Sequence, residues 1–150
     1  MITADIHTHS TFSEDGRSDI RDMVEAAISA GLQTYGISEH LNYEYERLHL
    51  KIDGEEPRPT DERAYFSAIR KLQREYKDRL FLLAGLEFGY DHDTRTQERY
   101  IRTAETYRPD FIINSTHVCL GRDCYFPDFF AGKSKEYAYN AYLYRVLESL

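Results

Sequence analysis

The stretch DIHTHS at residues 5–10, followed by SEDG at residues 13–16, decides how the rest of this sequence is interpreted. In an extended strand alternate side chains lie on the same face, so His7 and His9 are predicted to point the same way at one strand end. Two imidazoles that converge there make half of a metal site. The alternative is that both are ordinary polar residues on a half-exposed strand, and the later parts of the chain decide between the two.

Length and charge restrict the classes of protein to consider. The 150 residues suffice for one domain with a core, but a complete (β/α)8 barrel typically takes about 250 residues. A net charge of -7 argues against a general nucleic-acid binder, which needs a clustered basic surface. An acidic protein that handles a phosphate group usually needs metal ions locally. We find no basic leader and no run near the roughly 18 apolar residues of a membrane span, so we expect a cytoplasmic protein without a membrane partner.

Strand and helix patterns alternate along the chain. Strands are expected at residues 1–6, 34–38, 80–86 and 111–115. Helices are expected from the N-cap Asp19 to Ile28, and at residues 61–78, 94–108 and 133–150. The continuous apolar run at 80–86 is typical of a parallel strand buried on both faces. This order predicts an α/β protein with a parallel sheet or barrel.

Several segments do not fit the simple alternation. Residues 42–60 are charged, contain two prolines and show no sustained period, which predicts either a lid-like loop over an active face or a solvated insertion. The helix at 133–150 is apolar around most of its axis, so we expect other parts of a protein to cover it on several sides. The DHD cluster at 91–93 is predicted to lie on the surface.

The two cysteines, Cys119 and Cys124, lie close together in the sequence. They could form a disulfide or join His117 in a metal site. Free structural thiols in a reducing compartment are the preferred interpretation.

Each predicted strand leads to a possible metal ligand. His7 and His9 follow the first strand, and His40, Glu87 and His117 follow the second, third and fourth. Alone, each histidine could be a hydrogen-bonded structural residue, and Glu87 could face solvent. In parallel α/β folds, however, the carboxyl ends of the strands meet at one face, where sites assemble. The presence of a possible ligand after each of the four predicted strands therefore indicates a metal site.

These motifs resemble those of the PHP (polymerase and histidinol phosphatase) superfamily. Residues 5–16 resemble its opening motif, and ISEH at 37–40, GLE at 85–87 with Tyr90, and STH at 115–117 resemble the motifs that follow. The likeness covers essentially the whole chain, and residues 114–118 together with the long segment after His40 favour the histidinol-phosphatase branch. It implies the N-terminal portion, about four βα units, of a distorted (β/α)7 PHP barrel. Residues 1–150 are thus expected to be a single PHP domain, truncated at the C-terminus.

The resemblance also implies up to three divalent metal ions, zinc, manganese or iron, as cofactors. His7 and His9 would bind the first metal, and Glu87 would bridge it to a second metal bound by His117. The family carries a further histidine and a closing Asp-x-His in later strands, but no histidine follows His117 here. Fewer than three metals are therefore expected, with the site of His7, His9 and Glu87 the best occupied.

Asp15 and His40 would bind the third metal. The serines beside the ligands, Ser10, Ser38 and Ser115, are expected to form hydrogen bonds rather than to act as nucleophiles. No catalytic residue is expected beyond the metal ligands, since the sequence contains neither a Gly-x-Ser-x-Gly elbow nor a P-loop.

The implied activity is hydrolysis of a small phosphomonoester, with L-histidinol phosphate the favoured substrate, by a metal-bridged hydroxide. Phosphotyrosine and nucleotides are alternative substrates within the same class. The alternative outside the enzymes is an incomplete, non-catalytic PHP domain that binds metal or has a regulatory role. An open barrel edge and an uncovered last helix further predict self-association.

Overall fold

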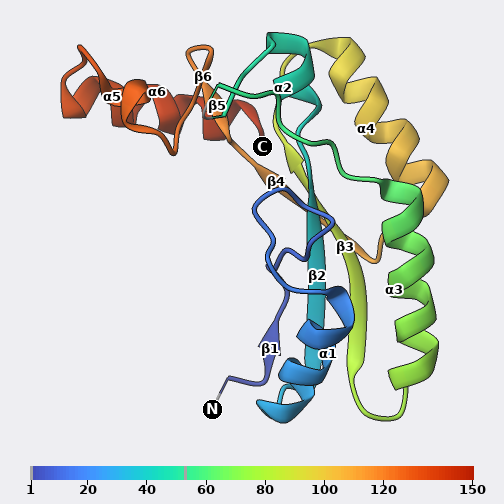
Figure 1. Ribbon diagram of the computed structural model, residues 1–150. Helices are drawn as coiled ribbons and strands as arrows, with labels where there is room; N and C mark the ends of the chain where they lie inside the picture. The colour runs from blue at the N-terminus through green and yellow to red at the C-terminus, as the bar shows by residue number, and fades with distance from the viewer. Residues whose placement is uncertain (1, 53) are drawn as a thin grey trace.

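A curled parallel sheet of four strands forms the centre of the computed structural model, which describes residues 2–52 and 54–150 (Figure 1). The strands are β1 (Ala4–Asp5), β2 (Thr34–Leu41), β3 (Phe81–Gly89) and β4 (Phe111–Ser115), and they lie in the order β1-β2-β3-β4. All three neighbouring pairs are parallel. The predicted α/β fold is confirmed, and the sheet is the curled half of a barrel.

Three helices connect successive strands and cover the same side of the sheet. They are α1 (Ile20–Ser29), α3 (Glu62–Tyr76) and α4 (Thr94–Tyr107) (Figure 1). The carboxylates of Asp19, Asp61 and Asp93 accept hydrogen bonds from backbone N–H groups in the first turns of these helices. Such N-caps satisfy donors that a helix leaves unpaired. Local sequence therefore fixes where each of the three helices begins.

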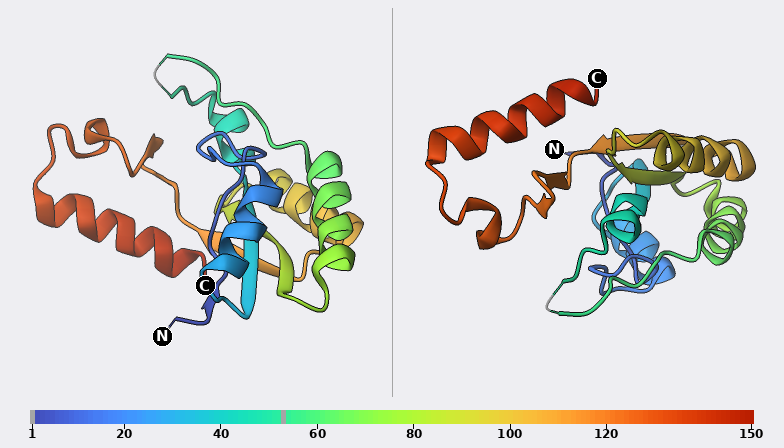
Figure 2. Two further views of the ribbon diagram at one scale, coloured as in Figure 1. Left: turned by 60° about the horizontal axis from the view of Figure 1, so that its bottom comes forward. Right: turned by 90° about the horizontal axis from the view of Figure 1, so that it is seen from above.

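The remaining elements gather near the carboxyl ends of the strands. A short helix α2 (Tyr43–Leu48) follows β2, and a two-stranded hairpin of β5 (Val118–Cys119) and β6 (Arg122–Asp123) follows β4. Then come α5 (Pro127–Phe130) and α6 (Lys135–Glu148). Figure 2 shows α5 and α6 standing apart from the layer of α1, α3 and α4.

The core lies between the sheet and the three covering helices. Val24, Ile37, Tyr65, Ile69 and Leu86 are completely buried there. The hydroxyl of Tyr65 lies 2.7 Å from the carbonyl oxygen of Ile37 and 3.0 Å from that of Gly85. Tyr65 thus ties α3 to both central strands while its ring fills the core.

On the other face of the sheet, Phe111 from β4 packs over two glycines. A Cβ atom at Gly85 would lie 2.1 Å from the Phe111 ring, and one at Gly36 would lie 2.9 Å from it. Both distances are below any normal contact, so only glycine leaves room for this ring. The packing holds β4 in register against β3, where Gly85 faces Phe111.

The strand and loop predictions need several corrections. The first strand is shorter than residues 1–6, because only Ala4 and Asp5 pair with β2; residue 1 lies outside the described part. The second and third strands run further than predicted and include His40 and Glu87. The segment 42–60 is not wholly irregular, since α2 occupies its start. A helix of six residues is too short to show a sequence period.

The prediction that residues 91–93 lie on the surface is wrong for Asp91, which is 1% exposed. Its carboxylate accepts hydrogen bonds from Nε and Nη2 of Arg47 at 2.6 and 2.9 Å. This ion pair compensates the cost of burying the charge. Asp93 caps α4, whereas His92 is exposed as predicted.

Helix α6 lacks the cover that its apolar sequence requires. Only Ala138 among its residues is buried, while Leu143 and Leu147 are 58% and 64% exposed. Cys119 and Cys124 are free thiols, as predicted. No helix among residues 2–52 and 54–150 is both long and apolar enough to cross a membrane.

We predict that Gly85→Ala destabilises the fold by about 2 kcal/mol, because the added methyl group must displace the Phe111 ring in a packed interior. Urea unfolding monitored by circular dichroism measures the change. The double variant Gly85→Ala/Phe111→Leu should lose less than the sum of the two single changes, since the smaller side chain relieves the clash. If the double variant loses as much stability as the two single variants together, this account of the packing is contradicted.

Candidate metal centre

Two imidazoles from the loop after β1 converge on a carboxylate from β3. His7 Nε2 lies 2.9 Å and His9 Nε2 3.3 Å from Oε2 of Glu87. The Glu87 side chain is only 4% exposed. The predicted convergence of His7 and His9 is therefore found, although both residues lie beyond the end of the strand.

His40, near the end of β2, connects Glu87 with Asp15. Its Nδ1 lies 3.4 Å from Glu87 Oε2, and its Nε2 lies 3.5 Å from Asp15 Oδ2. The rings of His9 and His40 are stacked, with centroids 4.1 Å apart and planes 3° from parallel. The register of the sheet explains the contact between His40 and Glu87, because these two residues are partners across β2 and β3.

His117, two residues after β4, approaches Glu87 from the opposite side. Its Nε2 lies 3.0 Å from Glu87 Oε1. Its Nδ1 lies 3.0 Å from Oδ1 of Asn42 and 3.7 Å from a carboxylate oxygen of Glu44. Both ring nitrogens of His117 therefore face acceptor oxygens, Nδ1 that of Asn42 and Nε2 that of Glu87, which is the arrangement of a protonated imidazole that donates from both nitrogens.

The structure brings all six predicted site residues together. Their ligand atoms form three overlapping groups in which every atom lies within 4.8 Å of the others. The groups are His7, His9 and Glu87; His9, Asp15 and His40; and His40, Glu87 and His117. The sequence analysis predicted the first group, the pair Glu87 and His117, and the pair Asp15 and His40, but not that His9 and His40 would each belong to two groups.

The residues fit a metal ion chemically. Nδ1 of His9 and Nδ1 of His40 are buried and have no hydrogen-bond partner among the described residues. Unsatisfied buried nitrogens are costly, and a metal ion is one partner that would satisfy them. Mixed imidazole and carboxylate donors suit zinc, iron and manganese.

Electrostatics around the site favour an ionised Glu87 and a neutral His40. Burial opposes ionisation of Glu87, but hydrogen bonds from His117 and Ser115 outweigh it and hold its pKa below the usual range. Burial lowers the pKa of His40 to about 4. For His117, the carboxylates of Glu44 and Glu87 overcome the effect of burial and raise its pKa to about 9. A metal at His117 would therefore have to displace a proton.

A buried carboxylate that the sequence analysis missed organises the loop that carries Asp15. Glu39 is completely buried, and its two oxygens accept hydrogen bonds from the backbone N–H groups of Ser10 and Ser13, at 3.1 and 3.0 Å. Both serine hydroxyls also donate to it. The Ser13 hydroxyl oxygen in turn accepts from the backbone N–H of His40 at 2.9 Å. Ser10 thus acts as a hydrogen bonder, as predicted.

Asn42 and Glu44 are further residues that the sequence did not indicate. Glu44 is 1% exposed and accepts a hydrogen bond from the Tyr100 hydroxyl at 2.7 Å. A Cβ atom at Gly89 would lie 1.8 Å from its carboxylate, so that glycine makes space for it. Both residues lie in the segment 42–60, where no periodicity marked them as structured.

An open cleft leads to the centre. It encloses about 1130 Å³ and is bordered by Asp15, His40 and His117, by α2, and by the segment that contains Arg58. Part of the segment 42–60 therefore lies over the functional face, which is the position that the lid-like interpretation predicted. The cleft gives a small substrate access to the metal centre.

A parallel half barrel that gathers histidines and carboxylates at the carboxyl ends of its strands defines an α/β domain with a candidate metal centre. The chain belongs to the PHP domain family, which matches residues 5–149. This confirms the resemblance stated from the motifs, and identifies the sheet as the N-terminal portion of a PHP barrel.

The similar curated proteins are histidinol phosphatases. The histidinol-phosphatase of Lactococcus lactis is 31% identical over 99% of this chain and 52% of its own length. A probable histidinol-phosphatase of Clostridium acetobutylicum is 26% identical over 97% of this chain and 51% of its own length. The chain therefore spans about half the length of the curated relatives it matches.

Solved structures agree in fold. The crystal structure of histidinol phosphate phosphatase from Lactococcus lactis, complexed with zinc, L-histidinol and phosphate, matches with a TM-score of 0.82 and 30% identity over 97% of this chain and 52% of that one. The putative histidinol phosphatase of Listeria monocytogenes has a TM-score of 0.79 at 24% identity, over 95% of this chain and 59% of that one, and supports the fold alone.

We predict that Glu39→Gln destabilises the chain by about 2 kcal/mol, because the amide has one acceptor oxygen for the buried donors of Ser10 and Ser13. Urea unfolding measures the loss. Glu75→Gln is the matched control, since Glu75 pairs with Arg21 where both side chains are more than 40% exposed, and such surface pairs contribute about 0 to 1 kcal/mol. Equal effects of the two changes would refute the organising role of Glu39.

Proposed function

We propose that this chain forms the N-terminal part of a metal-dependent phosphatase whose substrate is L-histidinol phosphate. The observation that carries the proposal is the convergence of four imidazoles on Glu87, with Asp15 beside His40, in three overlapping groups. The histidinol phosphatase of Lactococcus lactis, which binds zinc, L-histidinol and phosphate, supports the substrate and favours zinc. Manganese and iron suit the same donor set.

The proposed ligands are His7, His9, Asp15, His40, Glu87 and His117. His7, His9 and Glu87 form the first site, and Glu87 with His117 forms the second. Asp15 and His40 form the third. A bound divalent ion supplies charge that neutralises phosphate oxygens and lowers the pKa of water.

The protein's own groups have defined tasks in this proposal. Glu87, which is buried and whose pKa is held below the usual range, would hold two cations near one another and balance part of their charge. Asn42 fixes the ring of His117, and Glu39 fixes the loop of Asp15. The cleft beside His40 admits a small phosphomonoester from solvent. We propose no catalytic side chain beyond the metal ligands.

Glu87→Gln is predicted to weaken zinc binding at least about 100-fold and to abolish phosphate release, because the amide removes the negative charge that two of the three groups share. Calorimetry with zinc and a phosphate assay with L-histidinol phosphate, p-nitrophenyl phosphate and nucleotides, each with zinc or manganese, measure the two effects. The matched control is Glu98→Gln, an exposed α4 residue paired with Arg102. Unchanged activity in Glu87→Gln would exclude the proposed centre.

A second candidate is a PHP domain that binds metal without turnover. The observation behind it is that the chain spans about half the length of the curated relatives it matches, so the match alone does not carry over the activity of those whole proteins. Stoichiometric zinc binding by the wild-type chain without phosphate release from any of the substrates would establish this candidate over the first.

We also propose that the chain self-associates through its open edge. Ile112 on β4, and Leu143, Leu147 and Leu150 at α6, are between 44% and 96% exposed. Light scattering after gel filtration should give a dimer or larger species at micromolar concentrations. Leu143→Glu combined with Leu147→Glu should shift the chain to monomer, and a wild-type chain that is monomeric throughout would contradict the proposal.

A further inference from the structure

A second hollow adjoins the metal centre on the side of α6. It encloses about 320 Å³ between the β5–β6 hairpin, α5 and α6. Its walls include five aromatic residues, namely Tyr125, Phe129, Phe130, Tyr139 and Tyr142. We call it the aromatic cavity. Of the six proposed metal ligands, only His117 lines it.

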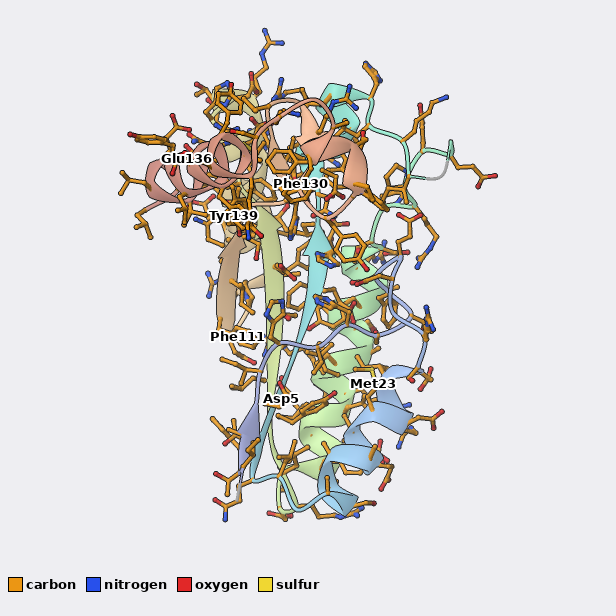
Figure 3. All side chains as sticks on the ribbon, turned by 90° about the vertical axis from the view of Figure 1, so that its left-hand side faces the viewer. Asp5, Met23, Phe111, Phe130, Glu136 and Tyr139 are labelled. Atoms are coloured by element: carbon orange, nitrogen blue, oxygen red, sulfur yellow. The ribbon has the colours of Figure 1, made fainter. Side chains whose placement is uncertain are left out.

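The rings of the aromatic cavity are unusually accessible. Tyr125 is 86%, Tyr139 50% and Phe130 40% exposed, whereas Phe129 is 1% exposed and forms a fixed part of the wall. The ring centroids of Phe130 and Tyr139 lie 6.2 Å apart, and Figure 3 labels both side chains in the part of the molecule formed by α5 and α6. Grouped exposed aromatic rings on a concave surface are typical of a binding site rather than of a core.

Three residues connect the aromatic cavity with the open cleft. They are His117, Asp123 and Tyr125, which border both hollows. His117 is the ligand candidate that lies 3.0 Å from Glu87. A molecule held in the cavity therefore lies directly beside the site proposed for phosphate.

Two hydrogen bonds fix the position of the Asp123 carboxylate. Its Oδ2 accepts a hydrogen bond from the Tyr45 hydroxyl at 2.6 Å, and its Oδ1 accepts one from the backbone N–H of Tyr125 at 2.8 Å. Burial and the Asp123 charge raise the pKa of Tyr45, so this hydroxyl remains a donor. Each carboxylate oxygen has further acceptor capacity for a ligand.

The charge of the aromatic cavity suits a cation. Its lining residues include one carboxylate, Asp123, and neither lysine nor arginine. Lys133 and Lys135 lie 5.4 and 5.6 Å from the ring centroids of Phe129 and Tyr139, yet neither lines the cavity. Aromatic faces attract ammonium and other organic cations, and a neighbouring carboxylate adds to that attraction.

We propose that the aromatic cavity binds the imidazole- and ammonium-bearing end of the substrate, with Asp123 as its counter-ion, while the phosphate group lies at the metal centre. This inference rests on the proposed phosphatase function and adds a recognition site to it. A flat ring stacks on tyrosine and phenylalanine, and a volume of about 320 Å³ is at the lower end of the range of small-ligand pockets. Asp123 and Tyr139 are then specificity residues.

The test uses two separate probes, L-histidinol and inorganic phosphate, each titrated into the zinc-loaded full chain. Asp123→Asn should weaken L-histidinol binding about tenfold, as expected for losing a charged hydrogen bond, and leave phosphate binding unchanged. Tyr139→Leu should weaken L-histidinol about fivefold through loss of the ring face. Because Tyr139 is half exposed, this second variant tests the site without endangering the fold.

Asp128→Asn is the matched control. Asp128 lies on α5, pairs with Arg122 and is outside the cavity lining, so L-histidinol binding should not change. Unfolding curves of all variants establish that they remain folded. The proposal is overturned if the wild-type chain fails to bind L-histidinol, or if Asp123→Asn and Tyr139→Leu both bind it as the wild type does.

Phosphate release separates this inference from the proposed function. If L-histidinol binding depends on Asp123 and Tyr139 but no substrate is hydrolysed, the cavity assignment holds and the phosphatase proposal fails. If L-histidinol phosphate is hydrolysed and the two variants keep the wild-type ratio of kcat/KM for L-histidinol phosphate over p-nitrophenyl phosphate, the phosphatase proposal holds and the cavity assignment fails.

Discussion

The contact on which the rest of the site depends is the approach of four imidazoles to the carboxylate of Glu87. Three of them, from His7, His9 and His40, lie within 3.4 Å of one oxygen, and His117 lies 3.0 Å from the other. A buried charge persists only when such partners surround it. Glu87 lies in the central strand β3, paired with β2 on one side and β4 on the other. The sheet therefore fixes the common centre, and the loops bring their histidines to it.

Each ligand-bearing loop has its own buried polar anchor. Glu39 holds the loop that carries Asp15, and Asn42 with Glu44 orients His117. Asp91, paired with Arg47, joins the end of β3 to α2. Breaking any of these pairs leaves a charge or a donor without a partner in a dry interior, which costs more than the contact contributes on average. The anchors therefore limit how far the ligands can move apart, which a multi-metal site requires.

Local properties of the sequence were sufficient to predict the fold class and to place five ligand candidates at strand ends, whereas Asp15 was included only because of the resemblance to the PHP superfamily. Strand period, capping aspartates and the position of histidines after apolar runs can each be read within a few residues. The anchors could not be read in this way. Glu39 and Ser10 are 29 residues apart, Arg47 and Asp91 are 44 apart, and Asn42 and His117 are 75 apart. Their pairing exists only once the chain has folded, so Asp91 was misjudged as a surface residue.

The geometry of the candidate centre differs from that of a closed structural metal site. A structural zinc site is closed by four protein ligands, whereas a catalytic site keeps positions open for water or substrate. Here each group offers three protein atoms, and the cleft and the aromatic cavity both reach His117. Two hollows thus meet at His117, one bordered by α2 and the segment that contains Arg58, and the other by five aromatic side chains and the Asp123 carboxylate. Under the proposed function, the first would receive the phosphate end of the substrate and the second its flat cationic end.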